Sequence, residues 1–170
     1  MLLKLKRAFP NIEEDFFEFL YQEVLKYSSY ISLPGPTGES NQLIYKSKGT
    51  VLCLGPEPDE LLKQTLLSLF LGNSVICPIS SKDCYIFIEI RKKKENILRL
   101  NDSPSMSLLV SNLYSAVFYS GNSTSMQEII LASRSELVPI VSSIYEAWEI
   151  LKEQVVTEDT TASGGNANLL

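Results

Sequence analysis

The first long pattern of apolar residues along the chain is typical of an amphipathic helix. From Asn11 to Tyr30, apolar side chains recur at spacings of three and four, which places them on one face of a helix. The stripe consists of Ile12, Phe16, Phe19, Leu20 and Val24. Asn11 is a suitable N-cap residue for this helix. Because the stripe is rich in phenylalanine, it requires a partner surface, either within this chain or on another molecule.

Short apolar runs separated by turn signals predict a parallel α/β sheet. Residues 50–54 and 74–79 are typical of buried strands, and the segment 58–71 between them begins with a proline and is typical of a helix. The pair Gly72-Asn73 is a helix-stop signal. Strand, helix and strand within about 30 residues form a βαβ unit. Further strands are predicted at residues 97–100, 116–119 and 138–142. The alternation predicts an α/β fold with a Rossmann-like, mostly parallel sheet.

The middle of the chain leaves two alternatives open. Residues 84–90 alternate weakly between apolar and polar side chains, so helix and strand compete there. The basic run 91–94 is interpreted as a solvated face or loop rather than a binding patch, because the chain as a whole is acidic. Beyond it, Ser125 to Glu128 forms a capping-box pattern that predicts the start of another helix.

Two segments rich in small residues stand at the two ends of the predicted sheet domain. Two prolines and two glycines follow Leu33 and predict a tight ordered loop that ends the first helix. Residues 150–161 favour an extended conformation, and residues 162–168 are small and polar. A frayed terminus is the ordinary fate of such a tail. We therefore expect a helical lead-in (1–32), a Rossmann-like α/β domain (33–149) and an extended C-terminal flap (150–170).

Composition and charge exclude several classes of protein. The 170 residues are 45% hydrophobic and 21% charged, which is ordinary for one globular domain. The formal net charge of -5 argues against nucleic acid as a partner, since phosphate binding requires a basic surface. No apolar run approaches the ~20 residues that span a bilayer. The N-terminal residues also lack a signal-peptide core, so we expect the cytosol as the compartment.

Histidine and cysteine usage restricts the chemistry further. The chain has no histidine, so neither a histidine-activated nucleophile nor a histidine metal site is possible. Cys53, Cys77 and Cys84 do not have the spacing of zinc ligands. Cys53 and Cys77 lie within apolar runs, where cysteine acts as a small buried hydrophobic residue. We therefore expect no catalytic residue and no metal site.

The turn after the first strand of the βαβ unit argues against nucleotide binding. A dinucleotide fingerprint requires three glycines for the backbone to approach the pyrophosphate, and this turn has only Gly55. Proline lacks the N–H that would donate to phosphate, and two prolines stand here. Three carboxylates would also repel an anion at the helix N-terminus. These residues are Pro56, Pro58, Glu57, Asp59 and Glu60. We expect a Rossmann-like shape that holds neither NAD nor FAD.

A second turn, Ser120 to Ser125, is uncharged and rich in serine and has free backbone donors. Such a turn could hold a small anion, but a satisfied helix cap is its more ordinary role. It is the basis of an alternative hypothesis, in which the chain is a free-standing small-ligand-binding protein or an enzyme. That hypothesis is weakened because a serine without an activating base is a poor nucleophile.

Both segments rich in small residues carry a resemblance to a known family. The first motif runs from Leu33 to Asn41 and includes Pro34, Gly35, Pro36, Thr37, Gly38 and Glu39. The second consists of Thr160, Thr161, Ala162, Ser163, Gly164, Gly165 and Asn166. Between them, residues 49–55, 71–73, 116–118 and 139–141 fall in family-like order. In these motifs the chain resembles the C-terminal region of the long-form proline utilization A proteins, over residues 30–170.

The resemblance implies a specific role. These proteins are bifunctional flavoenzymes that join proline dehydrogenase to Δ1-pyrroline-5-carboxylate dehydrogenase. Their C-terminal region resembles an aldehyde dehydrogenase domain without an active site, which docks on the aldehyde dehydrogenase module and helps to close the tunnel between the active sites. By position, the flap would cover about residues 150–168, with the second motif as its docking segment and the first as a structural loop. FAD and NAD would belong to the upstream modules, so none is expected in this chain.

Two readings of the origin of the chain therefore follow from the resemblance. It is either the detached end of a longer enzyme, whose partner is the proline dehydrogenase–aldehyde dehydrogenase module encoded upstream, or a split-gene remnant without function. The catalytic groups of the family lie in the modules upstream, so the resemblance implies no proline or aldehyde oxidation by this chain alone.

Overall fold

The computed structural model describes residues 6–7, 9–10, 12–55, 57–79, 97–101, 114–122, 124, 128, 130 and 138–159. Its elements, in chain order, are α2 (Glu14–Ser28), β1 (Ile31–Leu33), β2 (Glu39–Ser47), β3 (Thr50–Cys53), α3 (Pro58–Phe70), β4 (Ser74–Ile79), β5 (Ile97–Asn101), β6 (Ala116–Phe118), β7 (Ile140–Val141), the 3₁₀ helix η1 (Ile144–Ile150) and β8 (Leu151–Asp159). Several expectations lie outside the described residues: the segments 84–90 and 91–94, the cap at Asn11, and Ser125–Gln127 of the capping box.

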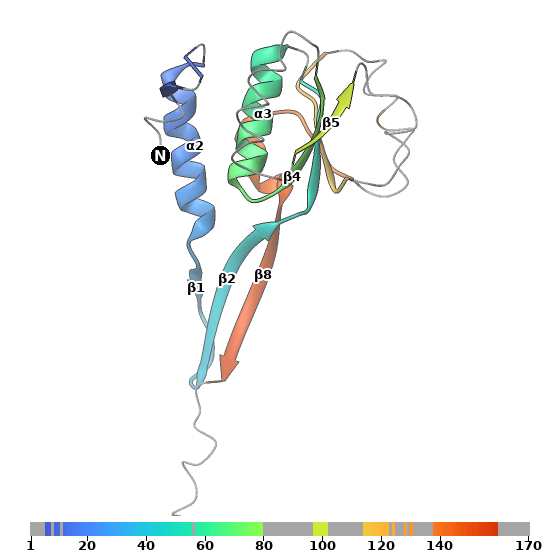
Figure 1. Cartoon of the computed structure of the whole chain (residues 1–170). Helices are drawn as coiled ribbons and strands as arrows, with labels where there is room; N and C mark the ends of the chain where they lie inside the picture. Colours follow the sequence, from blue (N-terminus) through green and yellow to red (C-terminus); the bar gives the residue numbers. More distant parts are fainter. Residues whose placement is uncertain are drawn as a thin grey trace, which may run out of the picture.

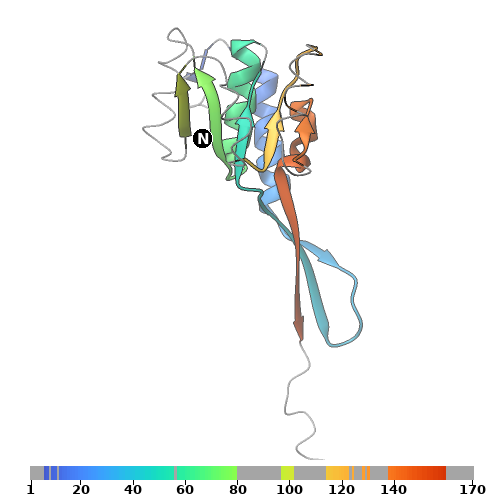
Figure 2. The ribbon, with the colours of Figure 1, turned by 90° about the vertical axis from the view of Figure 1, so that its right-hand side faces the viewer.

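Five of the strands form one parallel sheet in the order β5-β4-β3-β6-β7 (Figures 1 and 2). The chain adds β4 and β5 on one side of β3 and then returns to place β6 and β7 on the other side. This is the order of a Rossmann-like sheet. The predicted α/β fold class, with its βαβ unit and N-terminal helix, is confirmed. The strand predicted at 138–142 is shorter, since only Ile140–Val141 pair with β6.

The central strands β3 and β6 are buried on both faces of the sheet, as is typical of a parallel sheet. Alternate residues of the central strand β3 enter two separate apolar clusters: Val51 and Cys53 lie in the larger one, and Leu52 in the other. The helices α2 and α3 lie on the face of the larger cluster (Figure 1). The smaller cluster, on the opposite face, contains Leu54, Ile76, Tyr114, Val117, Tyr119 and Ile130.

The phenylalanine-rich helix finds its partner within the chain. Phe16, Phe17 and Leu20 of α2 are at most 5% exposed and pack in the same cluster as the leucines of α3. The helix begins later than predicted, because Glu13 is its N-cap residue and makes no side-chain capping bond. Glu14 and Asp15 occupy the first turn, where their charges suit the helix dipole.

A second, antiparallel sheet in the order β1-β2-β8 projects from the α/β core (Figures 1 and 2). The predicted loop after Leu33 is the turn of the hairpin β1-β2, and the predicted extended segment 150–161 contains β8. The strand β2 is absent from the sequence-based prediction, which treated residues 39–47 as part of a polar stretch inside the α/β domain. In the structure all nine residues of β2 pair with β8, so the loop and the C-terminal strand belong to one sheet.

No helix in the described part of the chain is long and apolar enough to cross a membrane.

Candidate functional site

The crevice where a Rossmann-like sheet binds ligands lies between the carboxyl ends of β3 and β6, where the strand order reverses. Here that crevice is bridged by a buried glutamine. Gln64 of α3 is 1% exposed, its Oε1 accepts from the Gly55 N–H at 3.0 Å, and its Nε2 donates to Ser120 Oγ at 3.1 Å. The Leu54 N–H donates to the Phe118 carbonyl at 2.9 Å. The Gly55 N–H, the Ser120 hydroxyl and the Leu54 N–H are therefore all hydrogen-bonded within the protein.

The turn after β3 also packs closely against the first turn of α3. A Cβ added at Gly55 would lie 2.7 Å from Leu61 Cα, so the glycine serves contact between this turn and α3. Pro58 occupies the start of α3, and Asp59 and Glu60 lie in its first turn. Glu57 is the N-cap residue of the helix and is exposed. These carboxylates make the helix N-terminus unfavourable for an anion.

The serine-rich turn is only partly described. Ser120 takes part in the glutamine bridge, and Asn122 and Thr124 are exposed. Ser123 and Ser125 lie outside the described residues. Ser120 therefore has a hydrogen-bond partner within the protein. A structural role of this kind is what the helix-cap interpretation of the turn implies.

The cysteines of the two central strands are structural. Cys53 and Cys77 are both 0% exposed, which confirms their expected role as buried hydrophobic residues. Burial raises the pKa of the Cys53 thiol, and its Sγ lies 3.7 Å from Ser68 Oγ. A thiol kept protonated in an apolar site is a poor nucleophile. Within the described residues no three histidine, cysteine, aspartate or glutamate side chains could together hold a metal ion.

The predicted structural loop joins the two strands of the first hairpin and contacts β8. The Glu39 N–H donates to the Pro36 carbonyl at 3.1 Å, and Gly38 has a φ of 97° that favours glycine. Asn41 lies under Gly35, where its amide leaves no space for a Cβ. Asn41 Oδ1 also accepts from Thr157 Oγ1 at 2.7 Å. The loop residues Pro34 and Thr37 are exposed.

The first motif therefore contacts β8 through Asn41, and β8 leads to the second motif. The second motif, at residues 160–166, follows β8 directly and lies outside the described residues. Within the segment predicted to be extended, Val155–Thr157 are paired along one edge with Asn41–Leu43 of β2. Sequence reasoning missed this pairing. The short apolar run Leu43-Ile44-Tyr45 was the available signal for β2.

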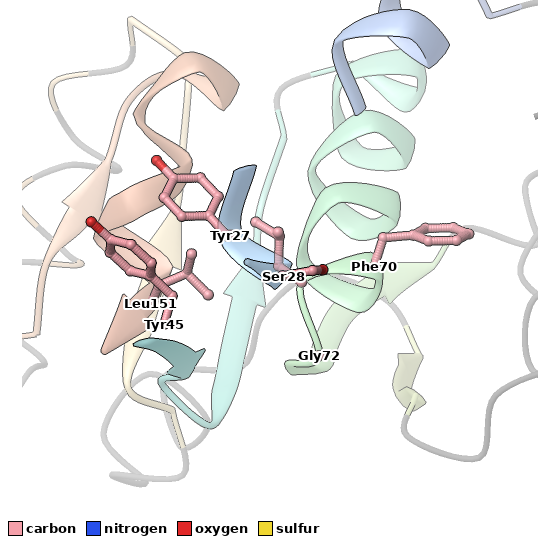
Figure 3. A pocket seen from close by; sticks show the side chains of 7 residues that line it. Tyr27, Ser28, Tyr45, Phe70, Gly72 and Leu151 are labelled. Atoms are coloured by element: carbon pink, nitrogen blue, oxygen red, sulfur yellow. The ribbon is translucent and has the colours of Figure 1, made fainter. Parts of the chain in front are cut away.

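A pocket of about 350 Å³ lies where the projecting sheet meets the core (Figure 3). Tyr27 of α2 and Tyr45 of β2 contact each other edge to face, with ring centroids 4.9 Å apart. Burial, together with the charge of Glu153, raises the pKa of Tyr45, whose hydroxyl donates to Glu153 Oε1 at 3.4 Å. The remaining lining residues are Ser28, Phe70, Leu71, Gly72 and Leu151. These side chains join the projecting sheet to the α/β core.

Comparison with known proteins gives a likeness in sequence to two PutA proteins. The chain is 24% identical over 158 residues, 88% of its length, to the bifunctional protein PutA of Escherichia coli, and the match covers 12% of that protein. It is 25% identical over 146 residues, 81% of its length, to the bifunctional protein PutA of Salmonella typhimurium, of which it covers 11%. This is weak homology to part of PutA. The resemblance read from the sequence is thereby confirmed. No family model matches the chain.

Solved structures show the fold of this PutA-like chain. It superposes on PnpE from Pseudomonas sp. WBC-3 with a TM-score of 0.60 at 17% identity, over 74% of the chain and 28% of PnpE. Betaine aldehyde dehydrogenase from Staphylococcus aureus gives a TM-score of 0.59 at 14% identity, over 74% of the chain and 28% of the enzyme. The AldH of Staphylococcus aureus gives 0.58 at 17% identity, over 78% and 32%. The chain therefore has the fold of about a third of an aldehyde dehydrogenase.

Proposed function

We propose that the chain is a non-catalytic domain of a bifunctional proline-catabolic enzyme that oxidises proline to glutamate. In this role it docks on the aldehyde dehydrogenase module and helps to close the tunnel between the active sites. The observation that carries the proposal is the homology to PutA along 88% of the chain, combined with an aldehyde dehydrogenase fold. The chain spans about an eighth of the length of that relative, so its partner would be the remaining catalytic module.

Two features of the structure support a non-catalytic role. The switch-point crevice is bridged by Gln64, which uses the Gly55 and Ser120 polar groups. Cys53 is buried, and its thiol pKa is raised by that burial. Under this proposal FAD and NAD bind to the upstream modules, and this chain binds neither.

Docking is supported by the exposure of the projecting sheet. A small antiparallel sheet needs a covered face or a further layer to be stable by itself. In β8 only Leu151 is buried, and the eight residues that follow it are exposed. The tail that continues from β8 carries the second motif, whose small side chains permit close approach to a partner backbone.

The cofactor part of the proposal is tested by calorimetric titration of the isolated chain with NAD and with FAD. We expect no saturable binding below about 100 μM, a range that includes most working cofactor sites. Purified chain should also show no proline or aldehyde oxidation above buffer. Turnover that is lost in Cys53→Ala would contradict the assignment as a non-catalytic domain.

The docking part is tested with a matching proline dehydrogenase–aldehyde dehydrogenase module that lacks its own C-terminal domain. Deleting residues 160–170 should weaken association with this module and lower the coupled flux from proline to glutamate. Deleting only residues 167–170 keeps the motif and serves as the matched control. If both deletions leave association and flux as they are in the full chain, the tail is not the docking segment.

A further inference from the structure

The pocket at the junction of the two sheets lies between the C-terminal ends of the helices α2 and α3. Residues 27–28 complete α2, and residues 70–72 contain the end of α3 and the turn that follows it. Tyr45 of β2 and Leu151 of β8 complete the lining. Its volume of about 350 Å³ is within the range of small-molecule sites, about 300–1,000 Å³. The pocket therefore has room for a small ligand.

The lining combines two aromatic rings with aliphatic side chains. Figure 3 shows Tyr27 and Tyr45 on one side of the pocket, and Ser28 between them and the end of α3. Phe70 is directed away from the two tyrosines. Tyr27 is 8% exposed and Tyr45 is half-buried. Because the two rings contact each other edge to face, each holds the other in position beside the pocket.

The electrostatic environment of the pocket is negative. The C-terminal end of a helix carries a partial negative charge, and two such ends meet here. The last turn of α3, which the structure describes in full, carries no basic residue to offset that charge. Tyr45 also contacts the carboxylate of Glu153, to which its hydroxyl donates at 3.4 Å. The pocket consequently favours a positively charged ligand.

A cation of the chain itself already lies against the aromatic pair. Lys26 Nζ lies 4.6 Å from the ring centroid of Tyr27, a distance at which the ring attracts a cation. A hydrogen bond with Tyr27 raises the pKa of Lys26, so the charged form of an amine is stabilised at this position. The Lys26 side chain is 59% exposed and is not part of the pocket lining. It therefore shows which charge this region prefers without filling the pocket.

We propose that this pocket binds a small organic cation of the alkylammonium class. The ammonium group lies against the ring of Tyr45, near the C-terminal ends of α2 and α3, and the alkyl chain packs on Leu71 and Leu151. Burial of the alkyl chain contributes a hydrophobic part of the affinity, and the charge selects an amine over neutral or acidic molecules of similar shape. The inference does not depend on docking to a catalytic module.

Other classes of ligand suit this pocket less well. An anion is repelled by the two helix ends and by Glu153. A metal ion requires several protein ligands, and within the described residues no three histidine, cysteine, aspartate or glutamate side chains gather to supply them. A neutral apolar molecule would contact the aliphatic walls but would gain nothing from the aromatic faces and the negative potential.

A series of head groups tests the charge preference in the full chain. Butylammonium, 1-butanol and pentanoate share the same butyl chain and differ in charge. We expect butylammonium to shift the amide NMR resonances of residues 70–72 with a Kd of about 1 mM, which is within reach of a ligand of about five heavy atoms. 1-Butanol should bind about tenfold more weakly, and pentanoate should give no saturable shift over the same concentrations.

Substitution of Tyr45 tests where the cation lies. Tyr45→Leu removes the ring and should raise the Kd for butylammonium about tenfold. Tyr45→Phe is the matched control, because it keeps the ring and loses only the hydroxyl that contacts Glu153; its Kd should stay within about threefold of the wild-type value. Circular dichroism verifies that each variant is folded.

Substitution of Lys26 tests the electrostatic part of the argument. Lys26→Gln removes the cation next to the pocket and should lower the Kd for butylammonium about threefold, because two like charges no longer repel each other. Lys46→Gln is the matched control, since it removes the same charge from the opposite face of β2. Its effect should be smaller.

Three results would overturn the proposal: no saturable shift up to about 20 mM butylammonium, well above the expected Kd; binding of 1-butanol or pentanoate as tight as that of butylammonium; or a folded Tyr45→Leu variant that binds like the wild type. The head-group series uses the unaltered chain, so it decides the matter even if Tyr45→Leu does not fold. None of these results bears on cofactor binding or on docking through the tail, so the proposed function is tested separately.

Discussion

The two sheets of this chain differ in how far the side chains of their strands are buried. In the parallel sheet, Val51, Leu52 and Cys53 of the central strand are 0% exposed, and apolar clusters cover both faces. In the projecting sheet, eight of the nine residues of β8 are exposed. The first sheet derives its stability from side chains buried within the chain. The second is held by backbone pairing and a few polar contacts, so more of its surface is available to another molecule.

The largest loss of stability is expected from a substitution in the buried region. Phe17→Ala removes a side chain that is 1% exposed and packs between the helices and the sheet. We expect the free energy of unfolding to fall by about 3–5 kcal/mol, measured by urea denaturation. Trp148→Ala is the matched control, because Trp148 is 57% exposed, and it should change stability by less than about 1 kcal/mol.

A smaller effect is expected at the bridge between the two halves of the parallel sheet. Gln64→Leu keeps the volume but leaves the Gly55 N–H without its acceptor and removes the donor to Ser120. The loss should be about 1–3 kcal/mol, the cost of a buried polar group without a partner. Gln22→Leu on the exposed face of α2 is the control. Equal effects of the two substitutions would show that the bridge contributes nothing.

A substitution in the projecting sheet should change the local stability of that sheet and not of the parallel sheet. Thr157→Val removes the hydrogen bond to Asn41, and we expect amide hydrogen exchange in β2 and β8 to become faster while exchange in β3 and β4 stays as in the wild type. Val156→Thr, on the opposite face of β8, is the control. A uniform increase across both sheets would show instead that they unfold as one cooperative unit.

The smallest effect is expected at the tail. Deleting residues 160–170 should change the melting temperature of the isolated chain by no more than about 2 °C, since its residues are mostly small or polar and bury little apolar area. Differential scanning fluorimetry can measure this. Unfolding of the truncated chain at a much lower temperature would place the tail in the core and contradict its assignment as a docking segment.

The difference between the two sheets also explains which elements could be predicted from sequence. β3, α3 and β4 were predicted almost to the residue, because their burial forces continuous apolar runs between turn signals. β2 was missed because it is half-exposed and mostly polar, with Glu39, Asn41 and Lys46 among its residues. Its structure depends on pairing with β8, more than 100 residues away in several contacts, which no local pattern can report.

The candidate site also contains some features that could be read from the sequence and others that could not. The prolines and carboxylates of the Gly55 turn, on which the expectation of no nucleotide binding rests, were visible in the sequence. The bridge by Gln64 was not, because a glutamine within an amphipathic helix has no local sign of burial. Likewise, the glycine motif after Leu33 was recognised, but only the fold shows that Asn41 links it to Thr157.

The point where the chain leaves the projecting sheet has a consequence for how such a domain can evolve. The Lys48 N–H donates to the Ile150 carbonyl at 3.2 Å, and Lys48 Nζ donates to the Glu149 carbonyl at 3.1 Å. The α/β core, residues 49–150, therefore starts and finishes at adjacent positions, as an insertion between two neighbouring strands would. A core attached in this way can be lengthened, exchanged or lose its ancestral chemistry without disturbing the pairing of β2 with β8. The exposed sheet β1-β2-β8 and the buried parallel sheet are thus free to change at different rates during evolution.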